Sequence, residues 1–181
     1  MAKLINGKEV SLAVQERIRK ETEALKEKGI TPGLAVVIVG DDPASRTYVN
    51  NKKKACERVG FHSEEYALPA TTTQEELLAL VKELNQRPEI NGILVQSPLP
   101  KGLDEKMIVE NIDPNKDVDA FHAMNVGKIM IGDFSFLPCP PAGVIELLDY
   151  ERVRSSGQKQ HRGQAYGNAA APSERHRNHL P

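Results

Sequence analysis

Ser45, Tyr48 and Lys52 have the residue types and the spacing that favour proton-transfer chemistry. Positions i, i+3 and i+7 share one face of a helix, and Tyr48 and Lys52 are neighbours one turn apart. An amine beside a phenol acts as an acid/base pair when partial burial and nearby positive charge bring the lysine pKa toward neutrality. The lysine run at 52–54 supplies such charge only weakly, so a solvated lysine face remains the alternative.

A second set of polar side chains follows later in the chain. Gln96 ends an apolar run, and the proline-stiffened loop PLPKGLD after it is able to present a flat amide to a ligand; a surface glutamine is the alternative. Three aspartates, Asp113, Asp117 and Asp119, lie near His122 in a stretch that we expect to be irregular. Their spacing matches no calcium loop, so we favour the pairing of a carboxylate with the guanidine-like edge of a heterocycle.

Alternating helix and strand patterns must position these side chains. Helical spacing of apolar residues before Gly29 predicts a helix of about five turns. The β-branched run at 34–40 predicts a strand buried on both faces, and Ser45 is expected to cap the helix that follows it as far as about Val59. HSEEYAL is a candidate strand, TTTQEELLALVKEL has the spacing of a capping box, and NGILVQS at 91–97 predicts another strand.

The order β-α-β-α-β predicts an α/β fold, a three-layer α-β-α domain with a mostly parallel sheet. The loops after Val39 and Val95 then lie on the same edge of the sheet, where open parallel sheets bind their ligands. Further along, FLPCPPAGVIELL predicts a short helix with Pro140 or Pro141 near its first position.

Composition excludes several classes of protein. The chain has 181 residues and a net charge of −1, which provides no global field to attract nucleic acid or an anionic membrane. No apolar run spans a bilayer and the N-terminus lacks the pattern of a signal peptide, so we expect a cytoplasmic protein. Cys56 and Cys139 have no metal-ligand spacing, and we expect both to be buried thiols.

Together these segments closely resemble the methylenetetrahydrofolate dehydrogenase/methenyltetrahydrofolate cyclohydrolase family of one-carbon metabolism. The resemblance runs from about Leu4 to Leu148 and rests on GDDPASRTYVNNKKKAC, GILVQSPLP, PNKDVDAFH, NVGK and PCPPAGV. It implies hydride transfer from methylenetetrahydrofolate to NADP, followed by water attack on the methenyl carbon and ring opening to formyltetrahydrofolate.

The resemblance also implies roles for single residues. Lys52 corresponds to the general acid/base of the cyclohydrolase step, and Tyr48 to the residue that packs on the folate and bonds with the lysine. Gln96 corresponds to the amide that positions lysine and substrate, and Asp119 to the carboxylate that anchors the pterin. Ser45, on the same helix face, is a candidate for substrate binding. No residue of this chain is assigned to NADP or to a metal.

Four positions depart from the family pattern. Ser97 stands where leucine is usual, Ala123 where proline is common, and Pro140 where the family has threonine. Ala120 follows Asp119 where the family has glycine. If that position needs a positive φ, the alanine strains the loop by about 1 kcal/mol and shifts Asp119.

Residues 1–149 and 150–181 differ in character. From Glu151 onward there are six Lys/Arg against two Asp/Glu and few large aliphatic residues, so we expect a disordered tail. The resemblance implies a Rossmann-type NADP domain from this point on, and we expect this sequence to lack it. Back-translated and shifted by one base, the stretch from Gly157 to Gly167 spells a glycine-rich phosphate loop, which indicates an out-of-frame translation and a truncation.

Two functional alternatives remain beside the enzyme. A truncated chain without NADP is expected to lose the dehydrogenase step, and a non-catalytic pseudogene product or folate-binding remnant competes with a weak cyclohydrolase. We expect a monomer or an aggregate where the family forms homodimers. A nucleic-acid arm at the tail is disfavoured, because its charges are sparse and no aromatic platform accompanies them.

Overall fold

The computed structural model describes residues 4–151 and shows an α/β fold. Its elements are α1 (Gly7–Lys26), β1 (Gly33–Val39), α2 (Pro43–Val59), β2 (His62–Leu68), α3 (Gln74–Gln86), β3 (Gly92–Val95), α4 (Glu105–Asn111), α5 (Ala123–Ile131) and α6 (Cys139–Tyr150). The strands form a parallel sheet in the order β2-β1-β3. The predicted parallel β-α-β-α-β order is therefore confirmed.

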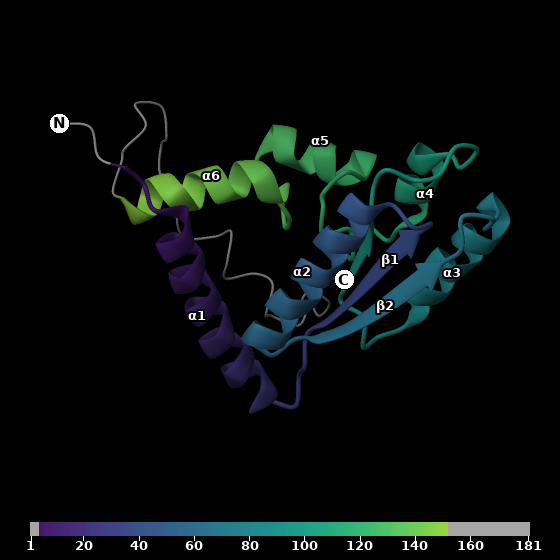
Figure 1. Cartoon of the computed structure of the whole chain (residues 1–181). Coiled ribbons are helices and arrows are strands. Elements are labelled where there is room, and N and C mark those ends of the chain that lie inside the picture. Colours follow the sequence, from purple (N-terminus) through teal and green to yellow (C-terminus); the bar gives the residue numbers. More distant parts are fainter. Residues whose placement is uncertain (1–3, 152–181) are drawn as a thin grey trace, which may run out of the picture.

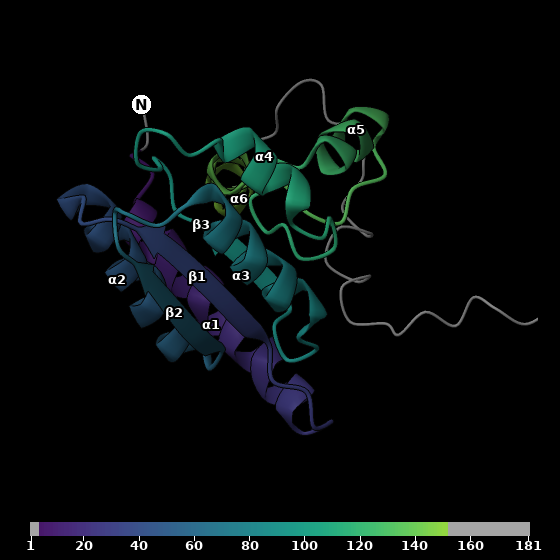
Figure 2. The ribbon, with the colours of Figure 1, turned by 90° about the vertical axis from the view of Figure 1, so that its right-hand side faces the viewer.

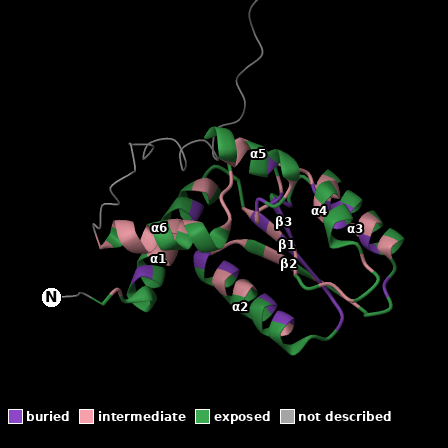
Figure 3. Ribbon diagram, turned by 90° about the horizontal axis from the view of Figure 1, so that it is seen from above, coloured by how far each residue is buried: buried purple, intermediate pink, exposed green. Residues whose placement is uncertain are grey.

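The central strand β1 is covered on both faces. Ala35, Val37 and Val39 pack with apolar residues of α3 and α4, whereas Val36 and Ile38 pack with α2 and β3. Successive side chains of a strand point to opposite faces, so a continuous β-branched run fits this position. Figure 2 shows α3 on one side of the sheet and α1 and α2 on the other. The buried residues, purple in Figure 3, gather along the strands and on the inner helix faces.

Two later helices extend from this three-layer core. In Figure 1, α6 lies across one end of α1, while α5 sits above the edge of the sheet near α4. Arg17 of α1 and Glu146 of α6 form an ion pair with 3.0 Å between nitrogen and oxygen. The Tyr150 hydroxyl donates to Glu9 at 2.9 Å, which fixes the same pair of helices a second time.

Capping side chains and prolines mark the N-termini of several helices. The expected capping by Ser45 is wrong: the N-cap of α2 is Asp42, whose carboxylate accepts from the Ser45 backbone N–H at 2.7 Å. Pro43, which has no N–H to satisfy, takes the first helical position. Thr73 forms the predicted capping box on α3, and the proline-led start of α6 is confirmed.

Two other expectations fail. The stretch around the aspartates is not wholly irregular, because it contains α5, which begins after His122 and ends at Gly132 with φ 78°. His122 caps this helix: its Nδ1 atom accepts from the Met124 backbone N–H at 3.1 Å. Aspartate and serine fill this role more often. Cys56 is buried as expected, but Cys139 is exposed, because it occupies the first turn of a surface helix.

Glu151 is the last residue that the structure describes. The predictions of a disordered tail and of a shifted reading frame therefore lie outside the described residues. Within residues 4–151, no helix is long and apolar enough to cross a membrane.

Candidate folate-binding site

The site lies where the carboxyl ends of β1 and β3 meet the first half of α2. Lys52 Nζ donates to Gln96 Oε1 at 2.7 Å, although the two residues are 44 positions apart. The backbone N–H of Gln96 donates to Val37 O at 2.8 Å, so the end of β1 holds it. Its Nε2 donates to Ser97 O at 2.6 Å. Both ends of the Gln96 amide are thus engaged, and its oxygen faces the lysine.

Tyr48 and Ser45 occupy very different environments on the same helix. Tyr48, one turn before Lys52, is 60% exposed, which leaves its ring free for a ligand to pack on. Ser45 is only 3% exposed, and its hydroxyl has no hydrogen-bond partner among the described residues. The structure therefore joins Lys52 to Gln96, leaves Tyr48 exposed one turn before Lys52, and buries Ser45 in the first turn of the same helix.

Asp119 reaches the same region from the loop before α5. Burial raises the pKa of its carboxyl, the Lys52 ammonium lowers it, and the Asp117 carboxylate raises it again. Although Cys139 is an exposed residue, partial burial of its thiol raises the thiol pKa. The Asp119 carboxylate raises this pKa further, and Lys52 lowers it. Lys52, Asp119 and Cys139 therefore share one electrostatic neighbourhood. Sequence reasoning missed Cys139 there, and its only signal was the family-like segment PCPPAGV.

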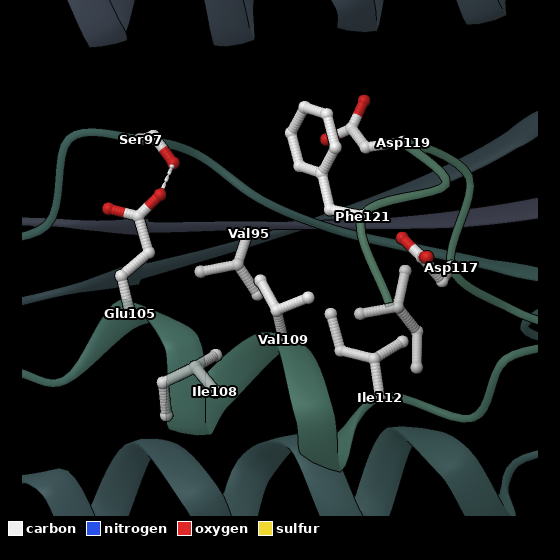
Figure 4. A pocket seen from close by; sticks show the side chains of 10 residues that line it. Val95, Ser97, Glu105, Ile108, Val109, Ile112, Asp117, Asp119 and Phe121 are labelled. Atoms are coloured by element: carbon white, nitrogen blue, oxygen red, sulfur yellow. Dashed lines mark hydrogen bonds between the residues drawn. The ribbon is translucent and has the colours of Figure 1, made fainter. Parts of the chain in front are cut away.

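A small pocket lies beside Asp119, between the end of β3 and α4. It has room for about one water, at about 10 Å³. Figure 4 shows Asp119 and Phe121 at its rim, with an apolar floor and a hydrogen bond from Ser97 to Glu105 on the opposite wall. The lining includes five aliphatic side chains: Ile93, Val95, Ile108, Val109 and Ile112. The pocket is thus largely apolar, with the carboxylates of Glu105, Asp117 and Asp119 also in its lining.

The backbone next to Asp119 is strained. Ala120 has φ 57°. Among the described residues, the other positive φ angles belong to glycines. The condition for the expected strain is therefore met. Its side chain is buried at 1% exposure, so the methyl group cannot relax into solvent. An L-residue in this region costs roughly 1–2 kcal/mol.

The three aspartates that the sequence places close together serve separate purposes. Asp113 accepts from the backbone and side chain of Asn115, whereas Asp117 accepts from the His122 N–H at 2.8 Å and from Asn125 Nδ2 at 3.0 Å. Asp117 and Asp119 both line the pocket, but the Asp117 carboxylate is already engaged by these two hydrogen bonds. Between Leu4 and Glu151, no group of three or more His, Cys, Asp or Glu side chains could hold a metal ion.

The helix starts that follow the strands do not fit the pyrophosphate of a dinucleotide. Such a group binds to free N–H groups at a helix N-terminus. Here Asp42 caps α2, Thr73 with Glu76 caps α3, and Asp104 caps α4. In each of these helices an oxygen atom of the chain itself accepts from one N–H of the first turn, and two of the three caps are carboxylates, which would repel phosphate.

Comparison with known proteins points to one family. A model described as the tetrahydrofolate dehydrogenase/cyclohydrolase catalytic domain matches residues 5–119. The bifunctional protein FolD of Acetivibrio thermocellus is 56% identical over 158 residues, which are 87% of this chain and 55% of that protein. FolD of Bacillus subtilis is 48% identical over 158 residues, 87% of this chain and 56% of that protein. The chain spans about half the length of the curated relatives it matches.

Solved structures agree with this result. The crystal structure of FolD from Campylobacter jejuni has a TM-score of 0.81 at 47% identity, covering 83% of this chain and 54% of that one. FolD from Trypanosoma brucei, complexed with NADP cofactor and inhibitor, has a TM-score of 0.82 at 36% identity, covering 87% of this chain and 54% of that one. The chain belongs to the tetrahydrofolate dehydrogenase/cyclohydrolase family.

Proposed function

We propose that this chain binds a one-carbon-substituted tetrahydrofolate and hydrolyses methenyltetrahydrofolate to formyltetrahydrofolate, with Lys52 as the acid/base group. The observation that carries the proposal is the 2.7 Å contact between Lys52 Nζ and Gln96 Oε1, with Asp119 nearby. A lysine held by a neutral amide is oriented without being paired to a carboxylate, so its nitrogen remains available to exchange a proton.

The reaction suits such a lysine. Water adds to the methenyl carbon, which forms a carbon–oxygen bond, and one of the two carbon–nitrogen bonds then breaks to leave a formyl group on the other nitrogen. One water proton moves to the departing nitrogen and the other is released to solvent. Lys52 Nζ is the group placed to take the first proton and return it to the departing nitrogen. Gln96 keeps that amine in position during both transfers.

Tyr48 and Asp119 are proposed to hold the substrate. The exposed Tyr48 ring offers a face for stacking of the folate. The Asp119 carboxylate can accept two hydrogen bonds from the aminopyrimidine edge of a pterin, which resembles a guanidine. The proposal extends to Ser45 only as support beneath Tyr48 and Lys52, because its buried hydroxyl does not reach the surface. The folate domain is proposed to comprise residues 1–149.

The proposal concerns the hydrolytic step, for which the described residues supply the groups. The comparisons support this proposal, since the matching family model and the related structure from Trypanosoma brucei both carry the name cyclohydrolase. The hydride-transfer step of that family is not assigned to any residue between Leu4 and Glu151.

The test uses the 181-residue chain with methenyltetrahydrofolate, whose absorbance is lost on hydrolysis. We expect hydrolysis above the uncatalysed rate, and we expect Lys52→Ala to abolish that excess. The matched control is Lys53→Ala, because Lys53 is the next residue of the same helix and is exposed. Hydrolysis that survives Lys52→Ala would refute the proposal. Binding without hydrolysis would identify the chain as a folate-binding remnant.

A further inference from the structure

The segment that leads to Asp119 is tied to the end of α3 by one amine. Lys116 Nζ donates to three backbone carbonyls there: Leu84 O at 3.1 Å, Asn85 O at 2.8 Å and Arg87 O at 2.7 Å. The last carbonyls of a helix have no partner within the helix, and a cation at this end is favoured by the helix dipole. Burial lowers the pKa of Lys116, as expected for an amine that has left the solvent.

The other side of the segment is fixed to β3 and α3. Ile93 N–H donates to Lys116 O at 2.7 Å, and Ile93 forms an isolated parallel bridge with Asp117. Asn85 of α3 bonds to the same segment twice: Nδ2 donates to Asn111 O at 2.8 Å, and Oδ1 accepts from Asp113 N–H at 2.9 Å. Residues 111–117 are thus held between a helix end and a strand.

A buried pair closes the turn on the far side of Asp119. The Asp117 carboxylate accepts from His122 N–H, and Asn125 Nδ2 donates both to Asp117 and, at 2.9 Å, to Pro114 O. Asp117 and Asn125 are each 3% exposed. Between Asp117 and His122 only four residues remain, and one of them is the strained Ala120. The position of Asp119 is therefore determined by its neighbours and not by contacts of its own.

We propose that Lys116 is a positioning residue for Asp119: its three bonds to the end of α3 hold the Asp119 carboxylate in the neighbourhood of Lys52 and so set the affinity for the folate. This inference rests on the proposed function. It differs from a purely structural role, in which Lys116 stabilises the fold and leaves folate affinity unchanged in the folded protein. Without the Lys116 amine the segment keeps its bonds to Asn85 and Ile93 but loses three bonds to the end of α3, and we expect Asp119 to shift relative to the ligand.

The test is a double-mutant cycle on the whole chain, with the dissociation constant for methenyltetrahydrofolate as the readout. Asp119→Asn is expected to weaken binding by about 10- to 100-fold, as for the loss of charged hydrogen bonds. Lys116→Met is expected to weaken binding by about 3- to 10-fold when Asp119 is present. In the Asp119→Asn background the same change is expected to alter binding by less than about 2-fold, because its effect passes through that carboxylate.

Two variants serve as controls. Lys116→Arg keeps a cation that reaches the same carbonyls, and it is expected to restore affinity to within about 2-fold. Lys82→Met removes an exposed amine from α3 and is expected to leave binding unchanged. If Lys116→Met does not fold, Asn85→Ala loosens the same segment from the same helix and takes its place in the cycle.

The outcomes separate the two proposals. If the unaltered chain does not bind methenyltetrahydrofolate, the proposed function fails and the inference fails with it. If the chain binds and Asp119→Asn weakens binding, the folate-binding part of the proposed function stands. Equal effects of Lys116→Met in both backgrounds, or no effect in either, would then overturn the positioning role alone.

Discussion

Replacing Gln96 by methionine tests the central contact of the site. The change keeps the length of the side chain but removes the acceptor that lies 2.7 Å from Lys52 Nζ and the donor to Ser97 O. A hydrogen bond to a charged group contributes about 1.5–3 kcal/mol, and 1.36 kcal/mol of barrier corresponds to about tenfold in rate. Hydrolysis of methenyltetrahydrofolate should therefore slow by roughly 10- to 150-fold at saturating substrate.

The assay is the initial rate of methenyltetrahydrofolate loss, with circular dichroism to establish that the variant is folded. Gln86→Met is the matched control, because Gln86 is an exposed glutamine at the end of α3. A folded Gln96→Met variant with a rate within about threefold of the unaltered chain would refute the reasoning, since so small a loss is below the value of one charged hydrogen bond.

Three further predictions concern stability, measured by urea unfolding. Ala120→Gly should raise the free energy of unfolding by about 1 kcal/mol, because glycine adopts φ 57° without strain; a loss of stability would contradict the strain. Asp117→Ala should cost about 3–5 kcal/mol, since it strands the buried Asn125 amide and the His122 N–H, and a loss below about 1 kcal/mol would show that water replaces the carboxylate. Bonds from Arg87, Tyr66 and His62 lower the pKa of Glu64 from 4.5 to about 2, so its contribution is present above pH 4.5 and is lost as the pH falls toward 2. Glu64→Gln should flatten that fall, and an unchanged pH profile would contradict the assignment.

Periodicity was sufficient to predict the sheet and most of the helices. The run at 34–40 contains four consecutive β-branched residues and no charged or polar side chain, which is typical of a strand covered on both faces. The capping box of α3 was also legible, because both of its partners lie within four residues. These features depend on local spacing, which the sequence displays directly.

Features that depend on competition between neighbours were harder to predict. Asp42 and Ser45 are both good N-cap residues, and the choice of Asp42 follows from Pro43, which can start a helix but cannot continue one. The segment around the aspartates looked irregular because the sequence of α5 contains an asparagine and a glycine, which are weak helix formers. Its order comes instead from long-range bonds of Lys116, Asn85 and Asn125, which no local pattern reveals.

The candidate site was predicted in part. The family resemblance implied that Gln96 positions Lys52, and the structure places Gln96 Oε1 2.7 Å from Lys52 Nζ. The burial of Ser45 and the exposure of Cys139 were not predicted, because helical spacing gives the face of a residue but not what covers it. The roles of these residues in catalysis remain predictions.

The 44-residue separation between Lys52 and Gln96 links ligand binding to the kinetics of refolding. The two side chains meet only after β3 has docked in register against β1. The chain between these two strands contains α2, β2 and α3. Contacts between distant residues form slowly compared with single helices. The change in pterin absorbance that accompanies ligand binding during refolding would therefore follow the completion of the sheet. The far-ultraviolet ellipticity would change earlier, as α1 and α3 form.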